Sequence, residues 1–132
     1  MARVGATTVV CLNEVSELRD RYPDYVDWLR KNARHHPIPD FHAPNLDELD
    51  VFVEELHDLL VAGETLLVHC GGGIGRAGTI AVALLLRRGA SLDDAIVTVR
   101  THRPMAGPEV GTQRDVLEAY ELVCRSRTIQ DR

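Results

Sequence analysis

The stretch HCGGGIGRAGT, residues 69–79, places a cysteine and an arginine on either side of five residues that are mostly glycine. Successive glycines let the backbone curl so that several N–H groups point at one centre, as in loops that bind oxyanions. In that setting, near a helix N-terminus and a guanidinium, the thiol of Cys70 should ionise at neutral pH. Arg76 can hold two phosphoryl oxygens in a bidentate fork. We therefore predict that Cys70 attacks phosphorus and forms a phosphocysteine intermediate.

The phosphate-binding residues expected from this pattern follow the cysteine directly: they are Gly71, Gly72, Gly73, Ile74, Gly75 and Arg76. The loop is not a nucleotide P-loop, because no Lys-Ser/Thr pair closes it, nor a dinucleotide turn, because a cysteine stands at its mouth. Taken singly, a buried cysteine is usually a small hydrophobe and a glycine-rich loop is often only a turn. Together, in this order, they favour catalysis or anion binding.

Apolar segments around the loop predict a strand, the loop and a buried helix in succession. The strand is TLLVH, residues 65–69, and the helix is AGTIAVALLL, residues 77–86, which is apolar on all sides. A second buried strand is predicted at TTVVCL, residues 7–12, and HHPI, residues 35–38, offers at most a short strand. This pattern predicts parallel strands that lead toward the same edge of a sheet.

Helical spacing and capping residues predict the remaining helices. One lies in YVDWLRKNA, residues 25–33, where Tyr25, Trp28 and Leu29 recur at helical spacing. Another follows Asn45, a candidate N-cap with Glu48 three residues on. Ser91 and Asp94 mark another that stops at Pro104, and a last helix covers residues 116–123. Strands alternating with helices predict an α/β fold with a mostly parallel sheet, and 132 residues suit a single domain over residues 1–132.

The amino-acid composition limits the kinds of partner and the cellular compartment that are expected. A net charge of −5 argues against nucleic acid or an anionic membrane surface as the main partner. No apolar run is long enough to span a bilayer, and the N-terminus lacks the features of a signal peptide, so a cytoplasmic protein is expected. Three cysteines are too few for a disulfide framework, which predicts reduced thiols.

Four stretches resemble consecutive landmarks of the cysteine-dependent protein tyrosine phosphatases, in the dual-specificity branch typified by the kinase-associated phosphatase. They are VVCLNEVSEL, HHPIPDFHAPN, HCGGGIGRAGT and GPEVGTQRDVLEAYE, and they cover most of the chain. The resemblance implies a phosphatase-like fold and a phosphomonoester hydrolase that acts on phosphotyrosine or with dual specificity. It also implies that no metal or other cofactor is needed.

The resemblance assigns roles to four further residues. Asp40, in the loop PIPDFHAP, would protonate the leaving group and then activate water, although an aspartate beside prolines is otherwise a turn or cap residue. Gln113 would position that water, unless it is an exposed residue in the first turn of a helix. His69 would support the shape of the loop, and Glu17 would either pair with Arg76 or face solvent.

Two departures from the family pattern stand out. The arginine is usually followed by serine or threonine, whose hydroxyl can hydrogen-bond the departing sulfur, but here Ala77 follows it and Thr79 should face away from the sulfur. The family also usually has another strand pair and a helix before the segment that resembles TTVVCL. The fold is therefore expected to lack those strands, and the edge they would form is either absent, replaced, or supplied by a partner chain, as in a homodimer.

Other interpretations stay open at this point. A catalytically weak phosphate-binding module would keep Arg76 and the glycines, and a rhodanese-like sulfurtransferase also uses a loop cysteine after a strand. The resemblance also implies phosphoprotein substrates rather than inositol phosphates, because family members that act on inositol phosphates tend to carry lysines between the cysteine and the arginine, and here those five residues are uncharged. The spacing of His35, His36 and His42 does not match a zinc site. Cys11 is either a disulfide partner that protects Cys70 from oxidation or a buried inert thiol.

Overall fold

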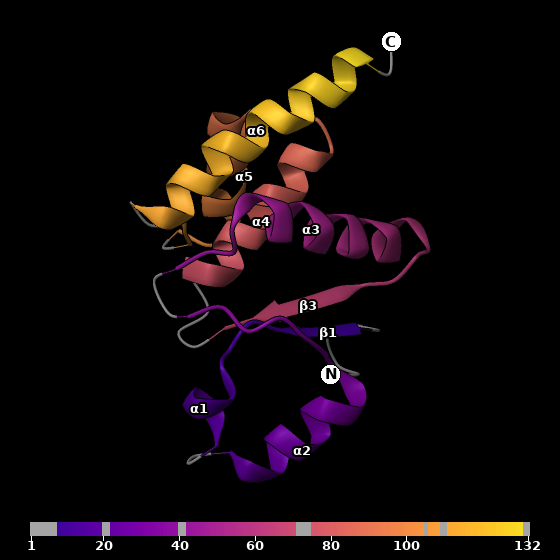
Figure 1. The fold of residues 1–132 in the computed structure, drawn as a ribbon, viewed down its shortest axis with the longest axis vertical. Helices are drawn as coiled ribbons and strands as arrows, with labels where there is room; N and C mark the ends of the chain where they lie inside the picture. The colour runs from indigo at the N-terminus through magenta and orange to yellow at the C-terminus, as the bar shows by residue number, and fades with distance from the viewer. Residues whose placement is uncertain are drawn as a thin grey trace.

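Three parallel strands form the centre of the protein (Figure 1). The structure is a computed structural model that describes residues 8–19, 22–39, 42–70, 75–104, 106–108 and 111–130. The strands are β1 (Thr8–Cys11), β2 (Arg34–His35) and β3 (Leu66–His69), in the order β2-β1-β3. Cys11 pairs with His35 on one side and His69 on the other. The predicted parallel sheet is confirmed, and the carboxyl ends of its strands meet at one edge.

The short edge strand starts earlier than the sequence predicts. β2 ends at His35, before Pro37, which has no N–H to donate to a ladder. The chain nevertheless continues alongside the end of β1, because the N–H groups of His36 and Ile38 donate to the carbonyls of Cys11 and Leu12 at 3.0 and 2.9 Å. These bonds carry Ile38 to the edge of the sheet where β1 and β3 end.

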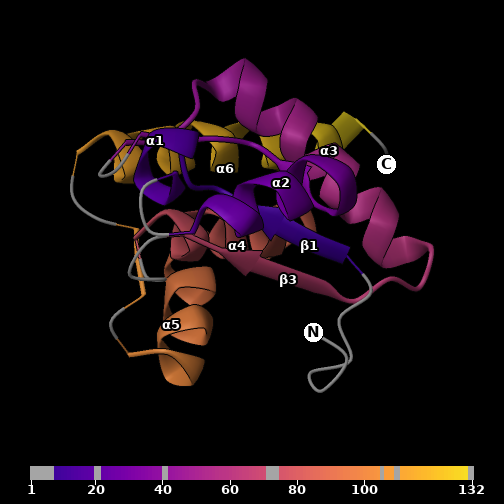
Figure 2. The same cartoon turned by 90° about the horizontal axis from the view of Figure 1, so that it is seen from below.

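Helices cover both faces of this sheet. One face is covered by α1 (Val15–Leu18) and α2 (Pro23–Asn32), which lie below the strands in Figure 1. The other face is covered by α3 (Leu46–Val61), α4 (Gly75–Arg87), α5 (Leu92–His102) and α6 (Thr112–Gln130). Figure 1 shows the sheet between the two groups, and in Figure 2, which looks from below, α1 and α2 are on the side nearest the viewer. None of the helices in the described part of the chain combines the length and the apolar character needed to cross a membrane.

The two helix starts predicted from capping residues agree with the structure, whereas α2 and α6 begin earlier than predicted, at Pro23 and Thr112, and the aromatic residues of α2 do not mark its buried face. The side chains of Asn45 and Ser91 accept from the N–H groups of Glu48 and Asp94, at 2.9 and 3.2 Å. Among the α2 side chains that the structure describes, Val26 is buried, while Trp28 is 37% exposed and stacks on Tyr25. Aromatic spacing alone does not distinguish a core face from a surface stack.

The two faces of β1 pack into different clusters of buried side chains. Val10 and Leu12 belong to the larger cluster, with α3, α4, α5 and α6, and Cys11 belongs to the smaller one, with Leu18 and Val26. This alternation is the two-residue period of a strand covered on both sides. In the larger cluster α4 is central, and none of its residues 75–86 is exposed, as its uniformly apolar sequence predicts.

Candidate active site

Cys70 lies at the carboxyl end of β3, between that strand and the first turn of α4. Its side chain is buried, with 7% exposure, and the backbone N–H of Ala77 donates to its Sγ at 3.4 Å. This bond places a backbone donor from the first turn of α4 beside the sulfur. The predicted phosphate-binding residues Gly71, Gly72, Gly73 and Ile74 lie outside the described residues, as does Asp40.

The guanidinium of Arg76 forms an ion pair with Glu17, which lies on α1 on the opposite face of the sheet. Its Nη1 and Nη2 atoms donate to Glu17 Oε2 and Oε1, both at 2.8 Å, and Nη1 also donates to the carbonyl of Ile38 at 2.8 Å. The guanidinium is 2% exposed, and its hydrogen bonds lower the pKa of Glu17 to about 2. Glu17 was expected either to pair with Arg76 or to face solvent. The structure shows the ion pair, which holds the arginine side chain in the first turn of α4.

Asn13 supports this ion pair, and the sequence does not single it out. It is buried directly after β1, and its Nδ2 donates to Glu17 Oε1 at 3.2 Å. Its side-chain carbonyl accepts from the thiol of Cys11 at 3.8 Å, and burial raises the pKa of that thiol. Only the position of Asn13 in the sequence could have indicated its role, because residues that follow neighbouring parallel strands meet at the same edge of the sheet.

His69 is fixed from α2. Its Nε2 lies 2.6 Å from the hydroxyl of Tyr25, and the two rings meet edge to face. Burial lowers the pKa of His69, which keeps the imidazole neutral at physiological pH. This geometry fits the supporting role predicted for His69 beside the cysteine, and Tyr25 is a second residue that sequence reasoning missed.

Gln113 is buried in the first turn of α6 rather than exposed there. Its Nε2 donates to the backbone carbonyl of His42 at 3.2 Å, and its Oε1 accepts from the hydroxyl of Thr79 at 3.1 Å. Thr79 also donates to the carbonyl of Gly75 at 2.8 Å. The structure thus joins the start of α4, the start of α6 and the segment that follows Asp40.

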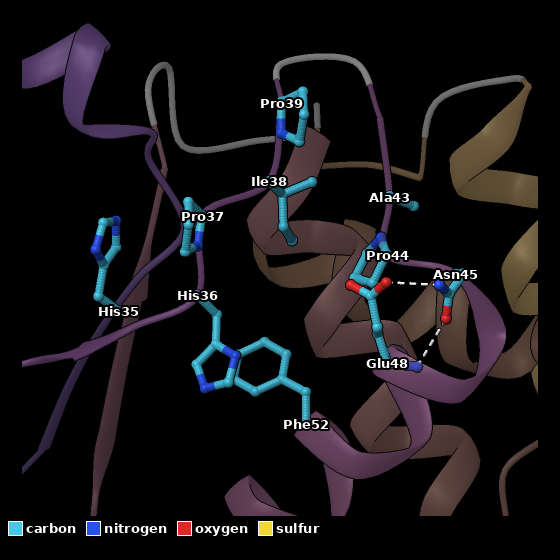
Figure 3. A pocket seen from close by; sticks show the side chains of 10 residues that line it. All are labelled: His35, His36, Pro37, Ile38, Pro39, Ala43, Pro44, Asn45, Glu48 and Phe52. Atoms are coloured by element: carbon cyan, nitrogen blue, oxygen red, sulfur yellow. Dashed lines mark hydrogen bonds between the residues drawn. The ribbon is translucent and has the colours of Figure 1, made fainter.

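A pocket of about 390 Å³ lies between residues 35–39 and residues 43–45, on either side of Asp40 in the sequence (Figure 3). Its floor contains the ring of His36, which stacks on Phe52 at 3.8 Å and lies 3.3 Å from Glu55 through Nε2. Burial lowers the pKa of His36. His35 instead contacts the carbonyl of Asn13 at 2.6 Å. Within the described ranges, no group of three or more histidine, cysteine, aspartate or glutamate side chains is arranged to hold a metal ion.

Cys11 and Cys70 lie at the ends of neighbouring parallel strands, as the sequence predicts. Their side chains, however, belong to different clusters: Cys11 packs with the smaller one and Cys70 with the larger one. The protective disulfide therefore stays a prediction, and forming it would require Cys11 to leave its packing beside Leu18 and Val26.

A family model described as "PTP-SAK: Swiss Army Knife protein, DSP-PTPase phosphatase domain" matches residues 1–131. The chain belongs to this family. Two solved structures are similar to this DSP-PTPase domain. Tk-PTP in the active form is 37% identical with a TM-score of 0.73, and the match covers 86% of this chain and 77% of that one. Kinase associated phosphatase with its catalytic site cysteine changed to serine is 26% identical with a TM-score of 0.80, covering 93% and 72%.

Curated relatives carry related names. Cyclin-dependent kinase inhibitor 3 of Rattus norvegicus is 32% identical over 76% of this chain and 53% of its own length. Dual specificity protein phosphatase 22 of Homo sapiens is 36% identical over 50% of this chain and 36% of its own length. This DSP-PTPase domain therefore spans about half or less of the relatives that it matches. The observed α/β fold and the family membership agree with the resemblance found in the sequence.

Proposed function

We propose that this protein is a phosphomonoester hydrolase of the protein-tyrosine or dual-specificity type, acting in the cytoplasm on phosphorylated proteins. The observation that carries the proposal is a buried cysteine sulfur that accepts a hydrogen bond from a helix N–H, in a site where an arginine of the same helix is held by an ion pair. Sγ of Cys70 accepts from the N–H of Ala77, and Arg76 lies in the first turn of the same helix, where Glu17 fixes its orientation. The arrangement provides a nucleophile at the end of β3 and a bidentate donor for phosphoryl oxygens at the start of α4.

In the proposed first step the Cys70 thiolate attacks phosphorus and the bond to the leaving oxygen breaks. Asp40 gives its proton to that oxygen, so the alcohol or phenol departs neutral. Gly71, Gly72, Gly73, Ile74 and Gly75 would supply backbone N–H groups, and Arg76 a fork, to the three remaining phosphoryl oxygens. His69, held by Tyr25, would keep the cysteine end of the loop in place.

In the second step water attacks the phosphocysteine, and the Asp40 carboxylate takes its proton. The sulfur leaves as thiolate, inorganic phosphate is released, and the enzyme returns to its starting state. Gln113 would position the water, which its buried place beside His42 and Thr79 supports. No metal or cofactor enters either step. The uncharged loop residues favour phosphotyrosine in proteins over inositol phosphates.

The test compares Cys70→Ser with Arg76→Lys on a phosphotyrosyl peptide. Cys70→Ser should abolish turnover but still bind the peptide, because the loop amides and Arg76 remain. Arg76→Lys should lose both affinity and rate, by about 10²- to 10³-fold in kcat/KM, since a point charge cannot reproduce the fork. Cys124→Ser, which changes a half-buried thiol on α6, is the matched control.

Substantial turnover by Cys70→Ser would contradict the mechanism. A wild-type protein that binds phosphopeptide without hydrolysing it would instead be a phosphate-binding module. Transfer of sulfur from thiosulfate to cyanide, measured beside p-nitrophenyl phosphate hydrolysis, reports the sulfurtransferase alternative, which the DSP-PTPase match does not favour.

A further inference from the structure

The segment that carries Asp40 has little side-chain packing of its own. Among the described residues from Arg34 to Asn45, only Ile38 is buried, and Pro37, Pro39 and His42 are exposed. Figure 3 shows Ile38 and Pro39 on one side of the pocket and Ala43 and Pro44 on the other. A turn from Pro39 to His42 is closed by the N–H of His42, which donates to the carbonyl of Pro39 at 3.0 Å, and Asp40 comes between these two residues in the sequence.

Side chains of α4 and α6 donate hydrogen bonds to the backbone at both ends of the turn. Arg76 of α4 donates to the carbonyl of Ile38 at 2.8 Å, just before the turn. Gln113 of α6 donates to the carbonyl of His42 at 3.2 Å, just after Asp40 and its neighbour. Because the anchored groups are backbone carbonyls, these bonds act on the path of the chain and not on any one side chain.

The orientation of the Gln113 amide depends on Thr79. A backbone carbonyl can only accept, so the nitrogen of the amide must face His42 and its oxygen must face the other way. That oxygen meets the Thr79 hydroxyl at 3.1 Å, so the hydroxyl is the donor, and it shares its one proton between Gln113 and the carbonyl of Gly75 at 2.8 Å. Both side chains are 1% exposed, so water does not readily replace this bond.

Threonine hydroxyls in helices often bond only to the carbonyl four residues back. Thr98 and Thr101 of α5 do this, with the carbonyls of Asp94 and Val97 at 2.8 and 2.7 Å, and both are exposed. Thr79 makes the same bond to Gly75 but is buried and has a second acceptor on α6. Its hydroxyl therefore links the start of α4 to Gln113, the residue that holds the backbone of His42.

We propose that Thr79 is a positioning residue for the general acid: its hydroxyl orients Gln113, and Gln113 holds the backbone of His42, two residues after Asp40 in the sequence. This role rests on the proposed phosphatase function. It adds to the water-positioning role of Gln113 a part in the first chemical step. Thr79 touches no substrate in this account and acts only through Gln113 and the His42 carbonyl.

The test measures kcat/KM for a series of aryl phosphates with Thr79→Val, a variant of nearly the same shape that lacks the hydroxyl. We expect a loss of about tenfold to a hundredfold for phenyl phosphate, whose leaving group needs a proton, because a misplaced catalytic group can cost this much. The loss should be much smaller for activated aryl phosphates. The plot of log kcat/KM against leaving-group basicity should therefore become steeper, and Thr79→Ser should restore the wild-type slope.

Thr101→Val is the matched control, because it removes the same kind of helix bond from the surface of α5. Gln113→Leu provides an independent variant, and it should steepen the slope in the same way. In the Gln113→Leu background, Thr79→Val should cost little more, since the two side chains act as one unit. If Thr79→Val fails to fold, Gln113→Leu alone still decides whether the anchoring of His42 affects acid catalysis.

Equal losses for good and poor leaving groups, an unchanged slope, or independent effects of Thr79→Val and Gln113→Leu would each overturn the proposal. Those outcomes leave the phosphatase function intact. Failure of that function appears differently: the wild-type protein would hydrolyse none of the aryl phosphates, or Cys70→Ser would remain active.

Discussion

The two sides of the candidate site are built in opposite ways. On the phosphate side, Cys70, Arg76, Thr79 and Gln113 are all buried, and they stand on β3, α4 and α6. On the acid side, the described residues before and after Asp40 line a pocket of about 390 Å³, and from Arg34 to Asn45 only Ile38 among the described residues is buried (Figure 3). The phosphate side is part of the core, and the acid side is attached to it.

This difference fits the chemistry asked of each side. Charge develops on the phosphoryl oxygens in every reaction, so donors fixed in a water-poor site are useful for all substrates. Proton donation matters only in proportion to the basicity of the leaving group. We therefore expect changes on the phosphate side to affect all phosphate esters and changes on the acid side to discriminate among them.

The largest effect that would separate the two sides is expected from Asp40→Asn. This variant cannot donate the proton, so kcat/KM should fall by about 10²- to 10⁴-fold for poor leaving groups such as phenyl phosphate. The loss should be far smaller for activated aryl phosphates, and the basic limb of the pH profile should disappear. Stopped assays on both substrate classes across the pH range measure this.

Asp47→Asn is the control for Asp40→Asn, because Asp47 is exposed in the first turn of α3. It should leave both substrate classes unaffected. A uniform loss across leaving groups in Asp40→Asn would assign Asp40 to the structure of the segment and would remove the contrast between the two sides.

The next effect concerns the phosphate side alone. Ala77 offers the sulfur of Cys70 a backbone N–H at 3.4 Å but no hydroxyl. Breakdown of the phosphocysteine should then be slow, and rapid-mixing experiments should show a burst of leaving group close to one per enzyme. Ala77→Ser adds a hydrogen bond to a charged sulfur, worth about 1.5–3 kcal/mol, which would speed breakdown by about ten- to a hundredfold.

In Ala77→Ser the burst should shrink while steady-state turnover rises to the limit set by phosphorylation of the enzyme. Ala81→Ser, one helical turn further along α4, should change neither quantity. No burst in the wild-type protein together with no gain in Ala77→Ser would show that the Ala77 N–H already stabilises the departing thiolate sufficiently.

Local patterns in the sequence were enough to predict the phosphate side in outline. The strand before Cys70, the buried helix after Arg76 and the caps at Asn45 and Ser91 depend on neighbouring residues, and the structure confirms them. The β2 strand was placed too late, because Pro37 cannot donate to a ladder and the two-residue strand lies before it. Helical spacing also suggested Trp28 where Val26 is buried.

The links that hold the site together could not be read from local patterns. Glu17 meets Arg76 across the sheet, Tyr25 meets His69 from α2, and Thr79 meets Gln113 from α6. Each bond joins residues that are far apart in the chain, so its existence depends on how the helices pack on the sheet. The resemblance to a family suggested Glu17 and Gln113 as site residues, but it did not supply the bonds that orient them.

The smallest expected effect tests whether the phosphate side is stabilised by its buried ion pair. Glu17→Gln leaves the guanidinium of Arg76, which is 2% exposed, without a carboxylate. At pH 7 we expect the free energy of unfolding to fall by about 1–3 kcal/mol, somewhat less than for a fully buried pair because Glu17 is partly exposed. Glu118→Gln, which breaks the exposed pair with Arg114 on α6, should cost about 0.5 kcal/mol or less.

The difference in the free energy of unfolding between the wild-type protein and Glu17→Gln should also depend on pH. The ion pair lowers the pKa of Glu17 from 4.5 to about 2, so its stabilising contribution is complete above pH 4.5 and is lost as the pH falls toward 2. Urea unfolding at a series of pH values should show the two proteins converging over that range, while Glu118→Gln stays close to wild type throughout. A stability difference that is constant from pH 7 to pH 2 would show that Glu17 acts through packing and not through its charge, and the phosphate side would then depend on burial alone.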